Sequence, residues 1–165
     1  MLITFLDSYK DSELARSIID RENLQVLSDQ SEYNFVKKVI DGDTIELSSG
    51  DKVRYIGIDT PEIDDGGGCY SWESFLKNKE LVEGKEVELR KDVSERDRFG
   101  RLLRYVFVEN IFVNEYLVKT GYAFAVKYPP DVLYSGVFEN AEASAQLNRL
   151  GLWSECDLGD ESLDL

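Results

Sequence analysis

Hydrophobic and polar residues alternate between residues 35 and 58, and two polar turns, at residues 41–43 and 48–51, interrupt the alternation. The segments around these turns are rich in valine and isoleucine. Successive side chains of a strand point to opposite faces of its sheet, so a period of two is typical of strands with one buried face. The pattern therefore predicts a β-meander of three strands.

The remainder of the chain carries both helical and strand patterns. Its hydrophobic spacing predicts helices over residues 70–82, 113–118 and 139–150 and strands over residues 87–89 and 102–108. Five strands and three helices, without a repeat or an internal linker, predict an α+β fold: a small five-stranded barrel with about three helices packed against it. In the first of these helices the apolar stripe consists of Trp72, Phe75, Leu76 and Leu81.

The length and the distribution of charge predict how the chain is organised. Its 165 residues correspond to about one domain. The formal net charge is −14, and residues 1–33, with 3 basic and 7 acidic side chains, and residues 154–165, with 5 acidic and no basic ones, hold most of the excess. We therefore expect a partly helical lead-in over residues 1–33, a folded domain over residues 34–156 and an acidic tail over residues 157–165.

The composition excludes several kinds of chemistry. The chain has no histidine, which rules out Ser-His-Asp and Cys-His catalysis and zinc sites that need imidazole. Any reaction must therefore use carboxylates, arginines or a metal held by oxygen atoms.

No run of about 20 apolar residues is present, so no segment is expected to span a membrane. The apolar opening at residues 1–6 is too short for the core of a signal peptide.

The two cysteines, Cys69 and Cys156, lie in no CxxC motif. They form either a disulfide or two buried thiols. A bridge would close a loop of about 88 residues and imply maturation outside the reducing cytosol, in a secreted or cell-envelope protein whose targeting segment precedes this numbering. Without a bridge the chain is expected in the cytoplasm.

Two acidic turns hold the first candidate site. Asp43 lies in the first turn of the meander and Asp59 at the end of its third strand, with Arg54 between them in the sequence. Folding of the meander can bring both carboxylates within reach of one cation, and oxygen ligands of this kind suit calcium. Each turn also suits an ordinary purpose, because Asp-Gly-Asp-Thr is a good hairpin turn and Asp-Thr-Pro a good strand terminator.

A second basic segment, residues 95–101, contains three arginines and precedes the strongly apolar strand. A planar guanidinium matches a phosphate group with two hydrogen bonds. Two guanidinium groups on one phosphoryl group would neutralise the charge that develops in a pentacovalent transition state. Charged loops are also commonly just solvated, and from the residues alone that alternative stays open.

Five sequence blocks follow one another at defined spacing: VIDGDT at residues 39–44, VRYIGIDTPE at 53–62, DRFGR at 97–101, VNEYLVKTG at 113–121 and LWS at 152–154. In order and spacing they resemble a staphylococcal nuclease-type (thermonuclease) domain over about residues 34–156. The resemblance implies an OB-fold barrel with three helices. It also implies a calcium-dependent nuclease that hydrolyses phosphodiester bonds of DNA and RNA.

The resemblance assigns roles to individual residues. The implied Ca²⁺ ligands are Asp43, Asp59 and Thr60, and the implied catalytic residues are Arg54, Glu62 and Arg101. The aspartates would use their carboxylates and the threonine its backbone carbonyl, the glutamate would position the attacking water, and the arginines would hold the scissile phosphate. All six positions carry the residue type that the family uses, which favours an enzyme over a binding module.

Three further residues are expected to bind the substrate, which would be DNA, RNA or both. Arg98 stands where relatives have a lysine and would hold a neighbouring phosphate. Phe99 offers a ring without a hydroxyl where a tyrosine is common, and Tyr128 is the candidate platform for stacking a base.

We expect a monomer. The acidic charge departs from the family's usual basic character and favours the alternative, a non-catalytic nucleic-acid or protein-binding module.

Overall fold

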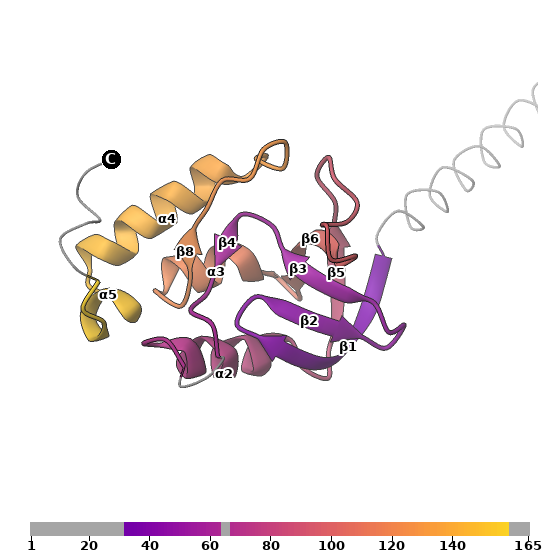
Figure 1. The fold of residues 1–165 in the computed structure, drawn as a ribbon, viewed down its shortest axis with the longest axis horizontal. Coiled ribbons are helices and arrows are strands. Elements are labelled where there is room, and N and C mark those ends of the chain that lie inside the picture. Colours follow the sequence, from indigo (N-terminus) through magenta and orange to yellow (C-terminus); the bar gives the residue numbers. More distant parts are fainter. Residues whose placement is uncertain (1–31, 64–66, 159–165) are drawn as a thin grey trace, which may run out of the picture. The chain divides into compact units, whose positions relative to one another are not determined.

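The computed structural model describes residues 32–63 and 67–158, and Figure 1 shows their arrangement. The predicted lead-in over residues 1–33 lies outside the described residues except for its last two, which begin the first strand. All but the first two residues of the predicted acidic tail also lie outside them.

Five strands close into a barrel, which confirms the predicted α+β fold. They are β1 (Glu32–Asp41), β2 (Thr44–Leu47), β3 (Lys52–Tyr55), β5 (Glu86–Arg90) and β6 (Leu102–Val108). Around the barrel they follow the order β3, β2, β1, β5 and β6, and a parallel pairing of β3 with β6 closes the ring. The predicted meander corresponds to β1, β2 and β3, which pair in antiparallel fashion.

The alternation of side chains in β3 decides where its arginine lies. Val53 and Tyr55 are buried in the core, and Arg54 between them points to the other face. Full burial of a valine-sized side chain contributes about 1.5–3 kcal/mol. A shift of the strand by one residue would exchange these positions and place the charge in the core, so the core fixes the orientation of Arg54.

The described part of the chain contains four helices: α2 (Ser71–Val82), α3 (Val113–Lys119), α4 (Ser135–Leu147) and α5 (Leu152–Glu155). The first two match predicted helices. The start predicted for the third was wrong, because α4 begins four residues before Glu139. This first turn carries Phe138, which is fully buried, and burial of a phenylalanine outweighs the weak helix propensities of Ser135 and Gly136.

The apolar stripe predicted for α2 is only partly buried. Trp72 and Leu76 are exposed, whereas Ser74 and Asn78 are buried. The hydroxyl of Ser74 donates a hydrogen bond to the carbonyl oxygen of Tyr122 at 2.6 Å, so its burial carries no unsatisfied polar group. The buried face of this helix thus combines hydrogen-bonded polar side chains with the core residues Leu81 and Val82.

A second, small sheet lies beside the barrel. Its strands β4 (Ile58–Asp59) and β8 (Phe124–Ala125) pair in antiparallel fashion, with Asp59 opposite Phe124. Another short strand, β7 (Ile111–Phe112), pairs in antiparallel fashion with β6. Neither β7 nor β8 was predicted, because two residues carry no recognisable periodicity. The third strand of the meander was predicted to continue to Asp59, which was wrong: the strand ends at Tyr55, Gly57 has a positive φ, and Ile58 and Asp59 belong to the second sheet. The β4–β8 pair fixes the backbone of Asp59.

Two close contacts fix the chain after α4. Gly121 and Gly151 both have positive φ, and the amide of Leu152 donates to the carbonyl oxygen of Gly121 at 2.9 Å. Just after α5, a disulfide joins Cys156 to Cys69, with Cα atoms 5.8 Å apart. The disulfide ties the end of α5 to the segment that leads into α2.

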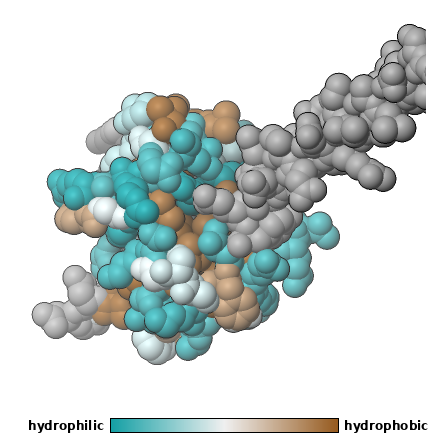
Figure 2. All heavy atoms as spheres, turned by 90° about the vertical axis from the view of Figure 1, so that its right-hand side faces the viewer, coloured by the Kyte–Doolittle hydropathy of each residue, from teal (hydrophilic) through white to brown (hydrophobic). Residues whose placement is uncertain are grey.

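One face of the described residues, shown in Figure 2, is mainly polar, with hydrophobic residues in small groups. Within residues 32–63 and 67–158, no helix has both the length and the apolar character needed to cross a bilayer.

The contact between Gly121 and Gly151 predicts a strong response to a single methyl group. A Cβ atom at Gly121 would lie 2.0 Å from the carbonyl oxygen of Leu150, and its φ of +77° is unfavourable for alanine. We expect Gly121→Ala to lower the free energy of unfolding by more than about 2 kcal/mol in urea denaturation. Gly136→Ala is the matched control, because nothing lies within 4 Å of its Cβ position. It should leave stability unchanged or raise it by up to about 1 kcal/mol, and equal losses in both variants would contradict the proposed role of this contact.

Candidate active site

The turn between β1 and β2 packs directly on the segment after β4. Within the turn, the amide of Asp43 donates to Oδ1 of Asp41 at 3.0 Å. Gly42 leaves no space for a side chain, because a Cβ atom there would lie 2.5 Å from Oγ1 of Thr60. The glycine of this turn therefore allows the two predicted metal-binding segments to touch.

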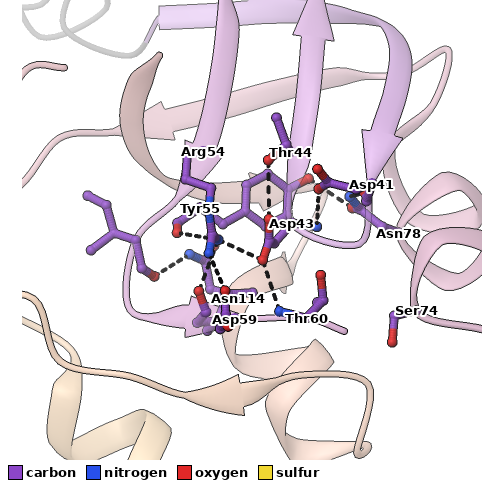
Figure 3. A network of polar contacts seen from close by, with 12 residues as sticks. Asp41, Asp43, Thr44, Arg54, Tyr55, Asp59, Thr60, Ser74, Asn78 and Asn114 are labelled. Atoms are coloured by element: carbon purple, nitrogen blue, oxygen red, sulfur yellow. Dashed lines mark hydrogen bonds and ion pairs between the residues drawn. The ribbon is translucent and has the colours of Figure 1, made fainter. Parts of the chain in front are cut away.

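Arg54 joins the two aspartates, as Figure 3 shows. Its Nη1 lies 2.7 Å from Oδ2 of Asp43, and its Nη2 lies 2.6 Å from Oδ1 of Asp59. Nη1 also donates to the carbonyl oxygen of Ile58 at 3.0 Å. The amide of Thr60 donates to Oδ2 of Asp43 at 3.0 Å. The two carboxylates that were predicted to share a cation thus share one guanidinium.

The two aspartates differ in their surroundings. Asp43 is 4% exposed, whereas the side chain of Asp59 is 45% exposed. Burial raises the pKa of the Asp43 carboxyl well above its ordinary value, Arg54 lowers this pKa in part, and the nearby Asp41 raises it again. A single guanidinium therefore does not fully compensate the buried carboxylate, and additional positive charge beside it would be favourable.

The available donor atoms suit a hard divalent cation. The carboxylates of Asp43 and Asp59 and the backbone carbonyl of Thr60 are all oxygen donors, which Ca²⁺ and Mg²⁺ prefer. No group of three or more His, Cys, Asp or Glu side chains within the described ranges is arranged to hold a metal ion. Water or phosphate oxygens would have to complete the coordination, so the residues fit a cation that is shared with a substrate.

A series of buried hydrogen bonds holds the turn that carries Asp43. The hydroxyl of Tyr55 donates to Oδ1 of Asn78 at 2.8 Å, and Nδ2 of Asn78 donates to the carbonyl oxygen of Asp41 at 3.1 Å. Burial raises the pKa of the Tyr55 hydroxyl, which keeps it protonated as a donor. Helix α2 thereby fixes the backbone on which Asp43 stands.

Asp97 organises the loop that carries the second pair of arginines. Its Oδ2 accepts from Nε of Arg101 at 2.7 Å, and its Oδ1 accepts from the amides of Phe99 at 2.9 Å and Arg101 at 3.0 Å. Burial by itself raises the pKa of Asp97, but the hydrogen bonds from Arg101 and from these amides outweigh it and hold the pKa below its ordinary value. The carboxylate is therefore charged and fixes the direction of the Arg101 side chain.

A cavity of about 490 Å³ lies between this loop and the strand that carries Arg54. Arg54 and Arg101 both line it, together with Arg98, Phe99 and Tyr128. The guanidinium carbon of Arg98 lies 4.7 Å from the centre of the Phe99 ring, and that of Arg101 lies 5.4 Å from it. The cavity thus combines cationic groups with aromatic faces.

The structure gathers most of the predicted site residues into two adjoining groups that share Arg54. One group surrounds the aspartates and the other lines the cavity: Asp43, Arg54, Asp59 and Thr60 in the first, and Arg54, Arg98, Phe99, Arg101 and Tyr128 in the second. Glu62 does not line the cavity; it is exposed, and its carbonyl oxygen accepts from the amide of Gly68 at 3.1 Å.

Sequence reasoning missed the supporting residues of the site. Asp97 was part of a recognised block but received no role, although an aspartate two residues before the amide it accepts from is typical of a local turn. Asn78 and Asp131 gave no local signal, because their partners lie 37 and 38 residues away in the sequence. Contacts of that range are visible only in the folded chain.

Comparisons with known proteins identify the family of this chain. The profile of the family described as "Staphylococcal nuclease homologue" matches residues 52–155. The endonuclease YncB and the SPbeta prophage-derived endonuclease YokF of Bacillus subtilis are each 38% identical over 126 residues, which is 72% of this chain. The thermonuclease of Staphylococcus intermedius is 35% identical over 130 residues, covering 75% of this chain and 77% of that protein.

The chain therefore belongs to the staphylococcal nuclease homologue family. It spans less than two thirds of the two Bacillus proteins, 60% of YncB and 43% of YokF.

Helix α4 holds the small sheet that positions Asp59. The amide of Ala125 in β8 donates to Oε1 of Glu142 at 2.8 Å, and β8 pairs with β4 next to Asp59. Burial raises the pKa of Glu142, which the Ala125 amide lowers only in part and Glu139 raises again. The ionised form of Glu142 is therefore less favourable in the folded state than in the unfolded chain.

This shift predicts a pH-dependent gain from Glu142→Gln. Glutamine keeps an oxygen that accepts from Ala125 but removes the charge. The folded-state pKa of Glu142 lies above the unfolded one, so the wild type loses stability as the pH rises between them. We expect the variant to be more stable at pH 8 by up to about 1 kcal/mol, allowing for partial exposure, and equally stable below about pH 4.

Chemical denaturation at both pH values measures this difference. Glu80→Gln in α2 is the control. It removes an ion pair with Lys77 in which the Glu80 side chain is 69% exposed, so it should give no such gain. A gain that persists unchanged at low pH would show that the charge of Glu142 is not its cause.

Proposed function

We propose that this chain is a nuclease that hydrolyses phosphodiester bonds of DNA, RNA or both and depends on Ca²⁺. The observation that carries the proposal is that Arg54 and Arg101 line one cavity while Arg54 contacts both Asp43 and Asp59. Membership of the family and the nuclease names of the relatives support it.

The cation would be held by Asp43, Asp59 and the backbone carbonyl of Thr60. The chemistry supplied at such a site is neutralisation of phosphate charge and a lowered pKa of nearby water. In the reaction, the oxygen of a water molecule bonds to phosphorus as the ester bond to the leaving oxygen breaks. Glu62 would orient this water and accept its proton, the general-base role of a positioned carboxylate.

The arginines would stabilise the charge that builds up on the phosphate. Arg54 and Arg101 present planar guanidinium groups that match two phosphate oxygens each. Asp97 already fixes the direction of Arg101, so little reorganisation is needed when the phosphate arrives. Arg98 would hold a neighbouring phosphate, and Phe99 and Tyr128, both exposed, would stack bases of a single strand.

Cleavage assays on single-stranded DNA and RNA test the catalytic roles. Degradation should require millimolar Ca²⁺ and stop on addition of a chelator. Arg54→Ala and Arg101→Ala should each lower kcat by about 100-fold or more, because groups that stabilise transition-state charge typically contribute this much. Arg90→Ala is the control, since its guanidinium packs 4.1 Å from the Phe107 ring and lies outside the cavity; its rate should stay within about twofold.

A measurement without turnover tests the metal site separately. Ca²⁺ that binds only the folded protein must raise its Tm, and this rise should be lost in Asp59→Asn. Full activity in either arginine variant would contradict the roles given to these residues. Binding of nucleic acid without cleavage under several divalent cations would instead identify a non-catalytic binding module.

The disulfide between Cys69 and Cys156 supports maturation in an oxidising compartment, as in secreted or cell-envelope proteins. Protein trapped with an alkylating reagent directly from the cells that produce it should carry no modified cysteine. Alkylation of both residues would place the protein in a reducing compartment.

A further inference from the structure

The wall of the cavity contains a buried residue, Asp131, to which the proposed mechanism gives no role. It is 7% exposed and lines the cavity beside Tyr128. Its amide donates to the carbonyl oxygen of Tyr128 at 3.0 Å, so the two residues close a tight turn. Asp131 and Tyr128 therefore border the same space.

The two oxygens of this carboxylate have different surroundings. Oδ1 accepts from the amides of Val93 at 3.0 Å and Ser94 at 2.7 Å. No hydrogen bond or ion pair from a described residue reaches Oδ2. Among the described residues, the fully enclosed polar side-chain atoms without a partner do not include Oδ2. Oδ2 therefore keeps some accessible surface. One oxygen thus anchors the side chain, and the other is an acceptor without a partner among the described residues, on a residue that lines the cavity.

A second aspartate ties the same two segments together from the opposite direction. Oδ2 of Asp92 accepts from the amide of Leu133 at 2.9 Å and from the hydroxyl of Tyr105 at 2.8 Å. Asp92 does not line the cavity. Since Asp92 and Asp131 both link residues 92–94 to residues 131–133, the wall that carries Asp131 is held from two sides.

The chemistry of the cavity defines what can meet this acceptor. A carboxylate oxygen accepts hydrogen bonds and repels phosphate, so a hydrogen-bond donor of the substrate is favoured beside it over another phosphate. Phe99 and Tyr128 are 68% and 65% exposed and offer flat faces for a base. The edge of an unpaired base is free for hydrogen bonding in a single strand.

We infer that Oδ2 of Asp131 selects the base of the bound nucleotide, and that the site prefers a base with an exocyclic amino group. Adenine, cytosine and guanine each offer an NH₂ group as a donor, and acidic side chains are known acceptors for such groups. Thymine and uracil have no amino group, and their single ring N–H donor lies between two carbonyl oxygens, which the carboxylate repels. The inference rests on the proposed function, because it assumes that the cavity holds a nucleotide of the substrate strand.

The decisive variant is Asp131→Asn. The amide oxygen of asparagine can still accept from Val93 and Ser94, and its NH₂ group then takes the place of Oδ2. The cavity would present a donor in place of an acceptor, so the preference should reverse in favour of thymine or uracil. A purely structural role of Asp131 would leave the base preference unchanged, because asparagine preserves the two anchoring hydrogen bonds.

Oligonucleotides that differ in one base beside a single cleavable phosphate provide the test. For the wild type, kcat/KM with adenine, cytosine or guanine should exceed that with thymine by about 10-fold. Asp131→Asn should prefer thymine, and Asp92→Asn, which changes the tie but not the cavity wall, should keep the wild-type preference. Replacing cytosine by pyrimidin-2-one, which lacks the amino group, should cost the wild type about 10-fold and tests the inference without any protein variant.

The outcomes separate this inference from the proposed function. Cleavage by the wild type without base preference, or an unchanged preference in Asp131→Asn, would overturn the inference and leave the nuclease intact. If no oligonucleotide is cleaved, the proposed function fails, and the same series is measured by fluorescence anisotropy. Tighter binding of the amino-bearing bases would then support the reading of the base by Asp131, and equal binding would overturn it.

Discussion

The guanidinium of Arg54 is the group on which the arrangement of the site depends. It contacts Asp43 from the turn after β1 and Asp59 from β4, and it lines the cavity shared with Arg101. Its strand is held on both sides, because β3 pairs with β2 and closes the barrel against β6. A largely buried charge needs partners, and here the two carboxylates and the Ile58 carbonyl contact Nη1 and Nη2 of the guanidinium. The site is therefore anchored in the closure of the barrel itself.

Carboxylates around the site serve largely to position the backbone. Asp97, Asp131 and Glu142 accept hydrogen bonds from main-chain amides of the loops and strand that border the cavity and Asp59. Bonds of this charged type are about twice as strong as neutral ones, so they fix segments that have no regular secondary structure. Some of the acidic side chains behind the net charge of −14 thus bind backbone amides within the fold. An acidic chain is therefore compatible with a cavity lined by arginines.

The fold was largely predictable because its main elements have strong periodic patterns. The meander and β6 alternate or remain apolar over enough residues to be recognised, and their barrel was confirmed. The start of α4 was wrong because burial of Phe138 outweighs local propensity. The third strand was predicted to reach Asp59, but it ends at Tyr55. The short β8 gave no pattern, yet its pairing with β4 is what places Asp59.

The sequence by itself determined which chemical groups are available: no histidine, an aspartate turn, and arginines in a strand and in a loop. It also determined the alternation that turns Arg54 away from the core, because residue type and strand period are local properties. Only the tertiary structure decided that Asp43 and Asp59 meet at one guanidinium and that Asp131 anchors a loop 37 residues earlier in the chain. Such contacts follow from how the whole barrel closes, and no local pattern records that.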